Sequence, residues 1–137
     1  MTAHRRSCSL VALLGATFLA TAAVAGSAPA AGDVEAGRKV FVRSCRVCHQ
    51  VDPAGANTMG PNLAGMAGKP AAFDTGYKGY SAAFTAAAAQ GLKWDAANLD
   101  RFLAAPAKAV PGTKMPVGAP DATQRRNLVA YLLTLKN

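Results

Sequence analysis

Cys45-Arg46-Val47-Cys48-His49 is the stretch of this sequence that decides its fold. Cysteines three apart on one helical turn project to the same side of the chain. This spacing, followed at once by a histidine, is the attachment motif for a c-type haem. Each thiol can form a thioether with one haem vinyl group, and the His49 imidazole is then held beneath the iron as its proximal ligand. The motif therefore predicts one covalently bound haem.

Two other kinds of site use the same residue types. A Cys-x-x-Cys pair in an exported protein can be a disulfide or a thioredoxin-like redox pair, but the sequence lacks the βαβ strands of that fold. A structural zinc site usually needs four Cys or His ligands, whereas the chain after residue 30 offers three. Haem attachment is therefore the favoured interpretation.

The first 30 residues have the pattern of a secretory signal peptide. A positive start at residues 4–6 precedes an apolar run over about residues 10–25, and Ala28-Pro29-Ala30 gives the small residues of a cleavage site. We expect cleavage after Ala30, with Ala25 as the second choice, and export to the periplasm. An uncleaved membrane anchor is the alternative, but the apolar run is shorter than the ~20 residues that span a bilayer. The Arg5-Arg6 pair also leaves twin-arginine export open.

Residues 31–137 then form a single small domain. The removed segment holds two arginines and no acidic residue, so the formal net charge falls from +8 to +6. A cationic surface steers acidic partners at salt-dependent rates. Nucleic acid is not an expected partner, because an exported protein does not meet it.

The composition predicts an all-α fold. The chain contains no isoleucine and no strand-length alternation of β-branched and polar residues, whereas alanine, a good helix former, is abundant. The first predicted helix starts near Asp33 and runs through Phe41 toward Cys45. The second covers about Ser81 to Gln90 and stops at Gly91, a glycine cap.

A third predicted helix opens at Asp95 and ends before Pro106. The fourth begins at Asp121, which lies three residues before Gln124 as in a capping box. Its apolar residues then follow at helical spacing, at Leu128, Tyr131, Leu132 and Leu135. Between the helices, residues 50–78 and 106–120 are long, irregular and rich in Gly and Pro. Loops of this length need something to order them, and a haem would supply both that template and apolar core volume.

A methionine is the expected second axial ligand, because no histidine besides His49 remains after residue 30. Met59 and Met66 are close to His49 in sequence and belong to the loop expected on the proximal side. Met115 is 66 residues downstream, between Pro111 and Pro116, which restrict the freedom of the chain. We favour Met115 as the ligand.

With these residues, the chain resembles the mitochondrial cytochrome c and bacterial cytochrome c2 family of class I cytochromes c. The resemblance covers about Asp33 to Lys136. Besides the haem motif, it rests on three short segments and one tryptophan: Gly60-Pro61-Asn62-Leu63, Trp94, Pro111-Gly112-Thr113-Lys114-Met115 and Leu128-Val129-Ala130-Tyr131-Leu132.

The resemblance implies a small class I cytochrome c fold, with crosswise N- and C-terminal helices and long loops around one haem. It implies that the Pro61 carbonyl accepts a hydrogen bond from the second ring nitrogen of His49. It also implies that the indole N–H of Trp94 donates to a buried haem propionate. At the helix crossing, the resemblance pairs residues of the first and last helices, namely Gly37 and Phe41 with Leu128 and Tyr131.

Three positions depart from the family pattern. Phe102 stands where the family often has a tyrosine that bonds the methionine sulfur, and Lys69 stands where an arginine commonly contacts a propionate. A second propionate-binding tyrosine has no clear counterpart, because Tyr77 and Tyr80 are nearby but out of register. The redox potential of the family is therefore not transferable.

The resemblance implies a soluble, monomeric one-electron carrier rather than an enzyme. Its expected partners are acidic-faced redox proteins such as the cytochrome bc1 complex, a terminal oxidase or a photosynthetic reaction centre. Arg46, Lys108 and Lys114 are the candidate cations near the exposed haem edge. Two alternatives remain: a haem enzyme or gas-binding cytochrome with a labile methionine ligand, and a fixed cytochrome subunit of a respiratory complex.

Overall fold

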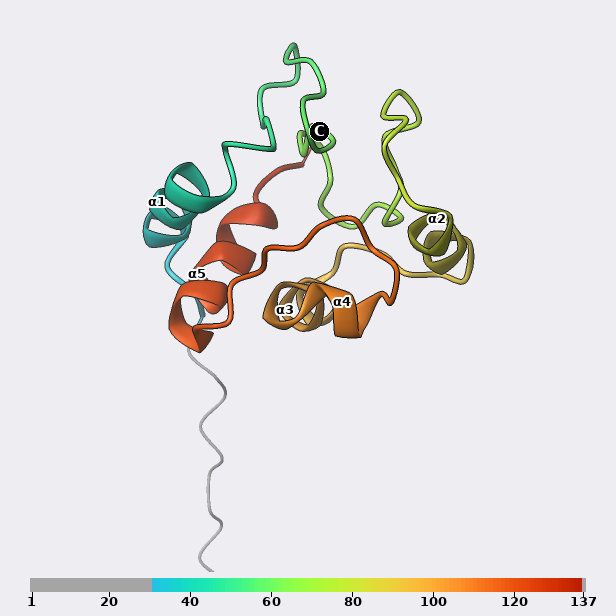
Figure 1. Ribbon diagram of the computed structural model, residues 1–137. Coiled ribbons are helices and arrows are strands. Elements are labelled where there is room, and N and C mark those ends of the chain that lie inside the picture. The colour runs from blue at the N-terminus through green and yellow to red at the C-terminus, as the bar shows by residue number, and fades with distance from the viewer. Residues whose placement is uncertain (1–30, 137) are drawn as a thin grey trace, which may run out of the picture.

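The computed structural model describes residues 31–136, so the predicted signal peptide and Asn137 lie outside the described residues. Five helices follow one another in this part of the chain: α1 (Val34–Ser44), α2 (Ala82–Ala89), α3 (Ala96–Ala104), α4 (Pro106–Ala109) and α5 (Ala122–Leu132) (Figure 1). These residues contain no strand beyond one isolated antiparallel bridge between Pro70 and Lys93. The all-α prediction is confirmed. Over the same range, no helix has the length and apolar character needed to cross a bilayer.

Local side-chain caps explain where the four longer helices begin. In each case the side chain before the first turn accepts a hydrogen bond from the backbone N–H three residues later, which satisfies one of the unpaired donors of a helix start. The caps are those of the predicted starts: Asp33, Ser81, Asp95 and Asp121, with donor–acceptor distances of 2.9, 3.1, 2.9 and 2.7 Å. Gly91, just after α2, has φ +97°, as expected of a glycine cap.

Two details differ from the prediction. The segment 106–120 was expected to be irregular throughout, but α4 forms at its start with Pro106 in the first turn, where its missing N–H costs nothing. At the start of α5 only half of the capping box forms. The Gln124 side chain does not return to the cap but accepts a hydrogen bond from Arg43 Nη2 at 2.8 Å. That bond instead ties the end of α1 to the start of α5.

The first and last helices pack closely against each other, as predicted (Figure 1). A Cβ built at Gly37 would collide with the Asn127 carbonyl oxygen and lie 2.9 Å from Tyr131 Cβ, so only glycine permits this approach. One turn along, the rings of Phe41 and Tyr131 lie 5.6 Å apart. Phe41 and Leu128 are each 1% exposed, so the centre of the contact between α1 and α5 is buried.

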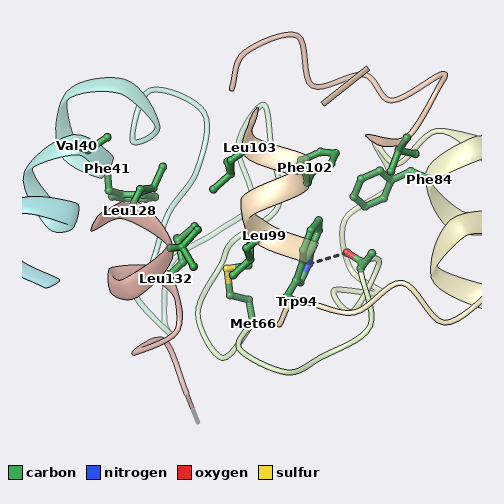
Figure 2. Close-up of a cluster of buried hydrophobic side chains, with 13 residues drawn as sticks. Val40, Phe41, Met66, Phe84, Trp94, Leu99, Phe102, Leu103, Leu128 and Leu132 are labelled. Atoms are coloured by element: carbon green, nitrogen blue, oxygen red, sulfur yellow. Dashed lines mark hydrogen bonds between the residues drawn. The ribbon is translucent and has the colours of Figure 1, made fainter. Parts of the chain in front are cut away.

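Helix α3 carries the other half of the core. Its buried face presents Leu99, Phe102 and Leu103, and Figure 2 shows Met66 beside Leu99 and Trp94 close by. The long segment between α1 and α2 is tied near its middle to the chain after α5 and to the chain before α3. Ala67 N donates to the Leu135 carbonyl oxygen at 3.2 Å, and Trp94 N donates to the Lys69 carbonyl oxygen at 2.8 Å. The helices therefore form a frame to which the long loops are fastened.

We expect Gly37→Ala to destabilise the haem-loaded protein by about 1–3 kcal/mol, because the added methyl overpacks a closed interface. In an open helix the same change would stabilise by roughly 0.5–1 kcal/mol. Denaturant unfolding followed by circular dichroism measures the difference, with exposed Lys39→Ala on the same helix as control. A stability equal to or above that of the wild type would contradict the close approach seen here.

Candidate functional site

The haem motif lies on the turn that ends α1. Cys45 is the C-cap of the helix, and its carbonyl oxygen accepts hydrogen bonds from both Cys48 N and His49 N, each at 3.0 Å. This turn brings the second cysteine and the histidine back over the first. Cys45 and Cys48 are half-buried and are not joined in a disulfide. Burial, together with the neighbouring Cys48, raises the pKa of the Cys45 thiol.

The His49 ring is oriented by one hydrogen bond. Its Nδ1 lies 2.9 Å from the Pro61 carbonyl oxygen, which is the contact that the family resemblance implies. A carbonyl can only accept, so Nδ1 carries a proton, and in the neutral ring Nε2 then keeps its lone pair. Burial lowers the pKa of His49, while the bond to Pro61 opposes that effect. A neutral imidazole with an unprotonated Nε2 is the form that binds a metal.

The loop after His49 has no regular structure, and Asn62 organises it. The Asn62 Nδ2 donates to the carbonyl oxygens of Asp52 at 2.7 Å and Gly55 at 2.8 Å, while its Oδ1 accepts from Ala64 N at 2.9 Å. One side chain thus closes two turns of the loop on either side of Pro61. The sequence alone predicts no role for Asn62, because its partners are backbone groups that a sequence does not reveal.

Gly60 explains how close the loop comes to the imidazole. A Cβ at this position would lie 2.7 Å from His49 Nδ1 and 3.0 Å from Nε2, and closer still to the carbon between them. The Gly60 N–H donates to the Cys48 carbonyl oxygen at 2.9 Å. Thr58 also donates to that oxygen through its hydroxyl. The backbone of the loop therefore lies directly against the histidine ring, and only a residue without a Cβ fits at position 60.

The three candidate methionines occupy different environments. Met66 is 2% exposed and belongs to the packed core, whereas Met59 is 68% exposed. Met115 is half-buried and packs against the edge of the core. Its N–H donates to Thr113 Oγ1 at 3.3 Å within the loop that follows α4. Of the three, only Met115 combines partial burial with a position on a loop outside the core.

An aromatic cluster lies between α2 and α3. The rings of Phe84, Trp94 and Phe102 are in mutual contact, with centroids 5.3–6.0 Å apart, and Tyr80 stacks on Phe84 at 5.6 Å. The Trp94 indole donates to the Ala71 carbonyl oxygen at 3.2 Å, which is the dashed line in Figure 2. Its predicted partner, a haem propionate, stays a prediction.

The Tyr80 hydroxyl is a buried polar atom without a hydrogen-bond partner among residues 31–136. Burial raises the pKa of this phenol to about 12 against a smaller lowering effect of the nearby Asp74 backbone, which is not positioned for a regular hydrogen bond, so the phenol is neutral at any ordinary pH and its O–H is free to donate. An unpaired buried hydroxyl is costly, and a carboxylate of a bound group would satisfy it. The sequence places Tyr80 out of register with the family's propionate-binding tyrosine, and the burial of its hydroxyl makes it a candidate donor of its own.

Comparison with known proteins gives the family. The model of the cytochrome c family matches residues 34–136. This chain belongs to the cytochrome c family. A cytochrome c2 of Rhodoblastus acidophilus is 42% identical over 107 residues, which cover 77% of this chain and 95% of the relative. The cytochrome c-type cyt cy of Rhodobacter capsulatus is 43% identical over 105 residues, 76% of this chain, but this match spans only half of that protein.

Among solved structures, a cytochrome c2 from Rhodospirillum centenum superposes with a TM-score of 0.70 at 33% identity, covering 77% of this chain and all of that one. Proteins of this family bind one covalent haem c and carry electrons rather than catalyse reactions on a substrate. The residues of this cytochrome fit that group. They offer two unpaired thiols, a neutral histidine and a buried hydroxyl that lacks an acceptor.

Two rival uses of the motif lose their support. In residues 31–136 no three Cys, His, Asp or Glu side chains converge as a metal-binding cluster, so a zinc site is not indicated. The strands of a thioredoxin-like fold do not occur in that range either.

The structure shows where two of the departures from the family pattern lie. Phe102 is buried within the aromatic cluster, and Lys69 is exposed.

We expect Gly60→Ala to disturb the proximal side, because the new methyl must displace the His49 ring. We expect the free energy of unfolding of the haem-loaded protein to fall by about 1–3 kcal/mol. Denaturant unfolding measures this loss as a lower midpoint concentration. Gly76→Ala is the matched control, since its Cβ would meet only side-chain atoms away from His49, Asp74 Oδ1 at 3.1 Å and Asn57 Nδ2 at 3.8 Å. Equal losses in the two variants would show that contact with His49 does not matter.

Proposed function

We propose that this cytochrome is a soluble periplasmic one-electron carrier whose single haem is ligated by His49 and Met115, and that it shuttles electrons between membrane redox complexes. The observation that carries the proposal is the orientation of His49. Its Nδ1 is engaged by the Pro61 carbonyl oxygen, and its Nε2 keeps a lone pair directly after two unpaired thiols. The bound haem supplies the reversible Fe(III)/Fe(II) couple.

The protein side chains hold that group and set its surroundings. Cys45 and Cys48 attach it, and the Pro61 carbonyl makes the His49 ring a stronger donor. A thioether opposite histidine favours the ferrous state and raises the potential. Met115 is our choice for that role, because Met66 is part of the core and Met59 is exposed. Two protein ligands would close both axial positions, which suits electron transfer rather than substrate chemistry.

The propionate groups would lie near the aromatic cluster. Tyr80 is the stronger candidate donor, because its buried hydroxyl has no partner in the described chain. Trp94 already has an acceptor in the Ala71 carbonyl, at a rather long 3.2 Å, and its contact with a propionate would have to compete with that bond. Tyr80 would thus supply a hydrogen bond in place of the one that an arginine commonly makes in the family, where this chain has Lys69.

The surface charges divide by role. All seven acidic residues accept a hydrogen bond within the domain: Asp33, Glu35, Asp52, Asp74, Asp95, Asp100 and Asp121. Five of them cap helices or turns, and two pair with arginines. Most basic residues have no acidic partner in residues 31–136. This cationic excess favours acidic faces on the partner complexes. Arg46, Lys108 and Lys114 are all exposed and able to contribute to it.

Met115→Ala should abolish the red-edge charge-transfer band of the ferric haem and open the ferrous iron to carbon monoxide. The physical reason is the loss of the thioether ligand. Met59→Ala is the control, since that side chain is 68% exposed. Optical spectra of the purified protein decide the matter. A band that survives in Met115→Ala would assign the ligand to another methionine, and rapid carbon monoxide binding by the wild type would favour a gas-binding cytochrome.

Raising salt from about 10 to 200 mM should slow oxidation by the physiological membrane complex, because screening shortens the reach of the surface charges. Steered association reaches 10⁸–10⁹ M⁻¹s⁻¹ at low salt in known cases. Stopped-flow kinetics with membranes from the native source measures the effect. A rate independent of salt would refute electrostatic steering, and co-purification of the cytochrome with one complex would favour a fixed subunit.

A further inference from the structure

Arg125 makes a three-point contact that the function described so far does not use. Its Nε donates to Asp100 Oδ1 at 2.8 Å, and its Nη1 donates to the carbonyl oxygens of Ala119 at 3.1 Å and Pro120 at 2.8 Å. The arginine side chain is only 14% exposed. From α5 it therefore holds both α3, which carries Asp100, and the chain that leads into α5 (Figure 1).

That chain carries Met115. We call residues 110–120 the methionine strap. Before Met115 the strap is closed by Thr113 N on the Val110 carbonyl at 3.0 Å and by Met115 N on Thr113 Oγ1 at 3.3 Å. After Met115, no hydrogen bond within the described chain holds residues 116–118. The next bond is from Ala119 N to the Leu103 carbonyl oxygen at 2.7 Å. Ala119 is thus the first residue after Met115 that is fixed to the rest of the domain, and we call it the distal end of the strap.

Ala119 is anchored through both of its backbone polar groups. Its N–H is held by the end of α3, and its carbonyl oxygen is held by Arg125. The adjacent Gly118 lies against α3 so closely that a Cβ there would collide with the Leu103 carbonyl oxygen and lie 3.0 Å from Pro106 Cδ. The side-chain part of this anchor is one poorly exposed cation with three acceptors, and hydrogen bonds from a charged donor are stronger than those between neutral groups.

We propose that Arg125 is a positioning residue for Met115: it fixes the distal end of the methionine strap and so keeps the thioether in place. The inference rests on the proposed role of Met115 as a ligand. A sulfur ligand is weak, so it stays bound only as long as its strap stays closed. An external ligand binds only to molecules in which the strap is open. Its apparent Kd is the intrinsic Kd divided by the open fraction, so a larger open fraction lowers the apparent Kd. Losing the Arg125 contacts should enlarge the open fraction.

Imidazole titration of the ferric, haem-loaded protein measures that fraction directly, through loss of the methionine charge-transfer band. We expect Arg125→Gln to lower the apparent Kd for imidazole about tenfold, which corresponds to about 1.4 kcal/mol in the opening equilibrium. Arg126→Gln is the matched control. It removes the same charge from the next residue of α5, where the side chain is exposed, and it should leave the Kd unchanged.

A purely structural role is separated by a second control. Val40→Ala weakens the core on α1, away from the strap, and lowers global stability without touching Arg125. It should leave imidazole binding unchanged even where its unfolding midpoint falls as far as that of Arg125→Gln. If the two variants shift imidazole binding equally, or if Arg125→Gln shifts only the unfolding midpoint, the proposal is wrong.

Asp100→Ala keeps the experiment decisive if Arg125→Gln does not fold. Asp100 is half-exposed, and its loss weakens the arginine contact without removing the cation. We expect an apparent Kd for imidazole about threefold lower than in the wild type, and an unchanged Kd would overturn the proposal. If the wild-type protein lacks the charge-transfer band, the proposed function is contradicted as well, because Met115 would then not be a ligand. A band that is present and lost in Met115→Ala, with no effect of Arg125 or Asp100, would leave the carrier function intact and sink this inference alone.

Discussion

The hydrogen bond between His49 Nδ1 and the Pro61 carbonyl oxygen is the contact on which the rest of the site depends. It joins the turn that ends α1 to a loop without regular structure, and it fixes which ring nitrogen can bind a metal. Asn62 holds that loop from both sides, and Gly60 lets it press on the ring. The packing of α1 against α5 supports the same turn from behind. The fold of the chain therefore orients His49 and favours the neutral form of its ring.

The parts of this structure that follow from local chemistry were predictable from the sequence. Asp33, Ser81, Asp95 and Asp121 marked the helix starts, because a cap and its donor are three residues apart. The close approach at Gly37 followed from the family resemblance. The short helix α4 was missed, since Pro106 signals a loop as readily as a first helical turn. The surroundings of Tyr80 and Asn62 could not be predicted for a different reason. The burial of the Tyr80 hydroxyl and the backbone partners of Asn62 depend on how the loops fold, which no local pattern contains.

The domain separates its charges by task. Its carboxylates cap helices and turns or pair with arginines, so they stabilise the fold. Most of its cations face solvent without an acidic partner in the described chain. Arg125 is the exception, a poorly exposed cation that links two helices to the methionine strap. On this account the exposed cations choose the partner, and the aromatic cluster and the two axial side chains set the properties of the group that transfers the electron.

The central claim is that Met115, and neither Met59 nor Met66, would join His49 as the second protein ligand of the haem. Nuclear magnetic resonance of the ferrous protein with labelled methionine methyl groups tests it most directly, because a methyl group above an aromatic macrocycle is shifted far upfield. The account predicts that the Met115 methyl signal lies far outside the ordinary methionine range, with the Met59 signal within it. A strongly shifted Met59 or Met66 signal in place of Met115, or three ordinary signals, would contradict it.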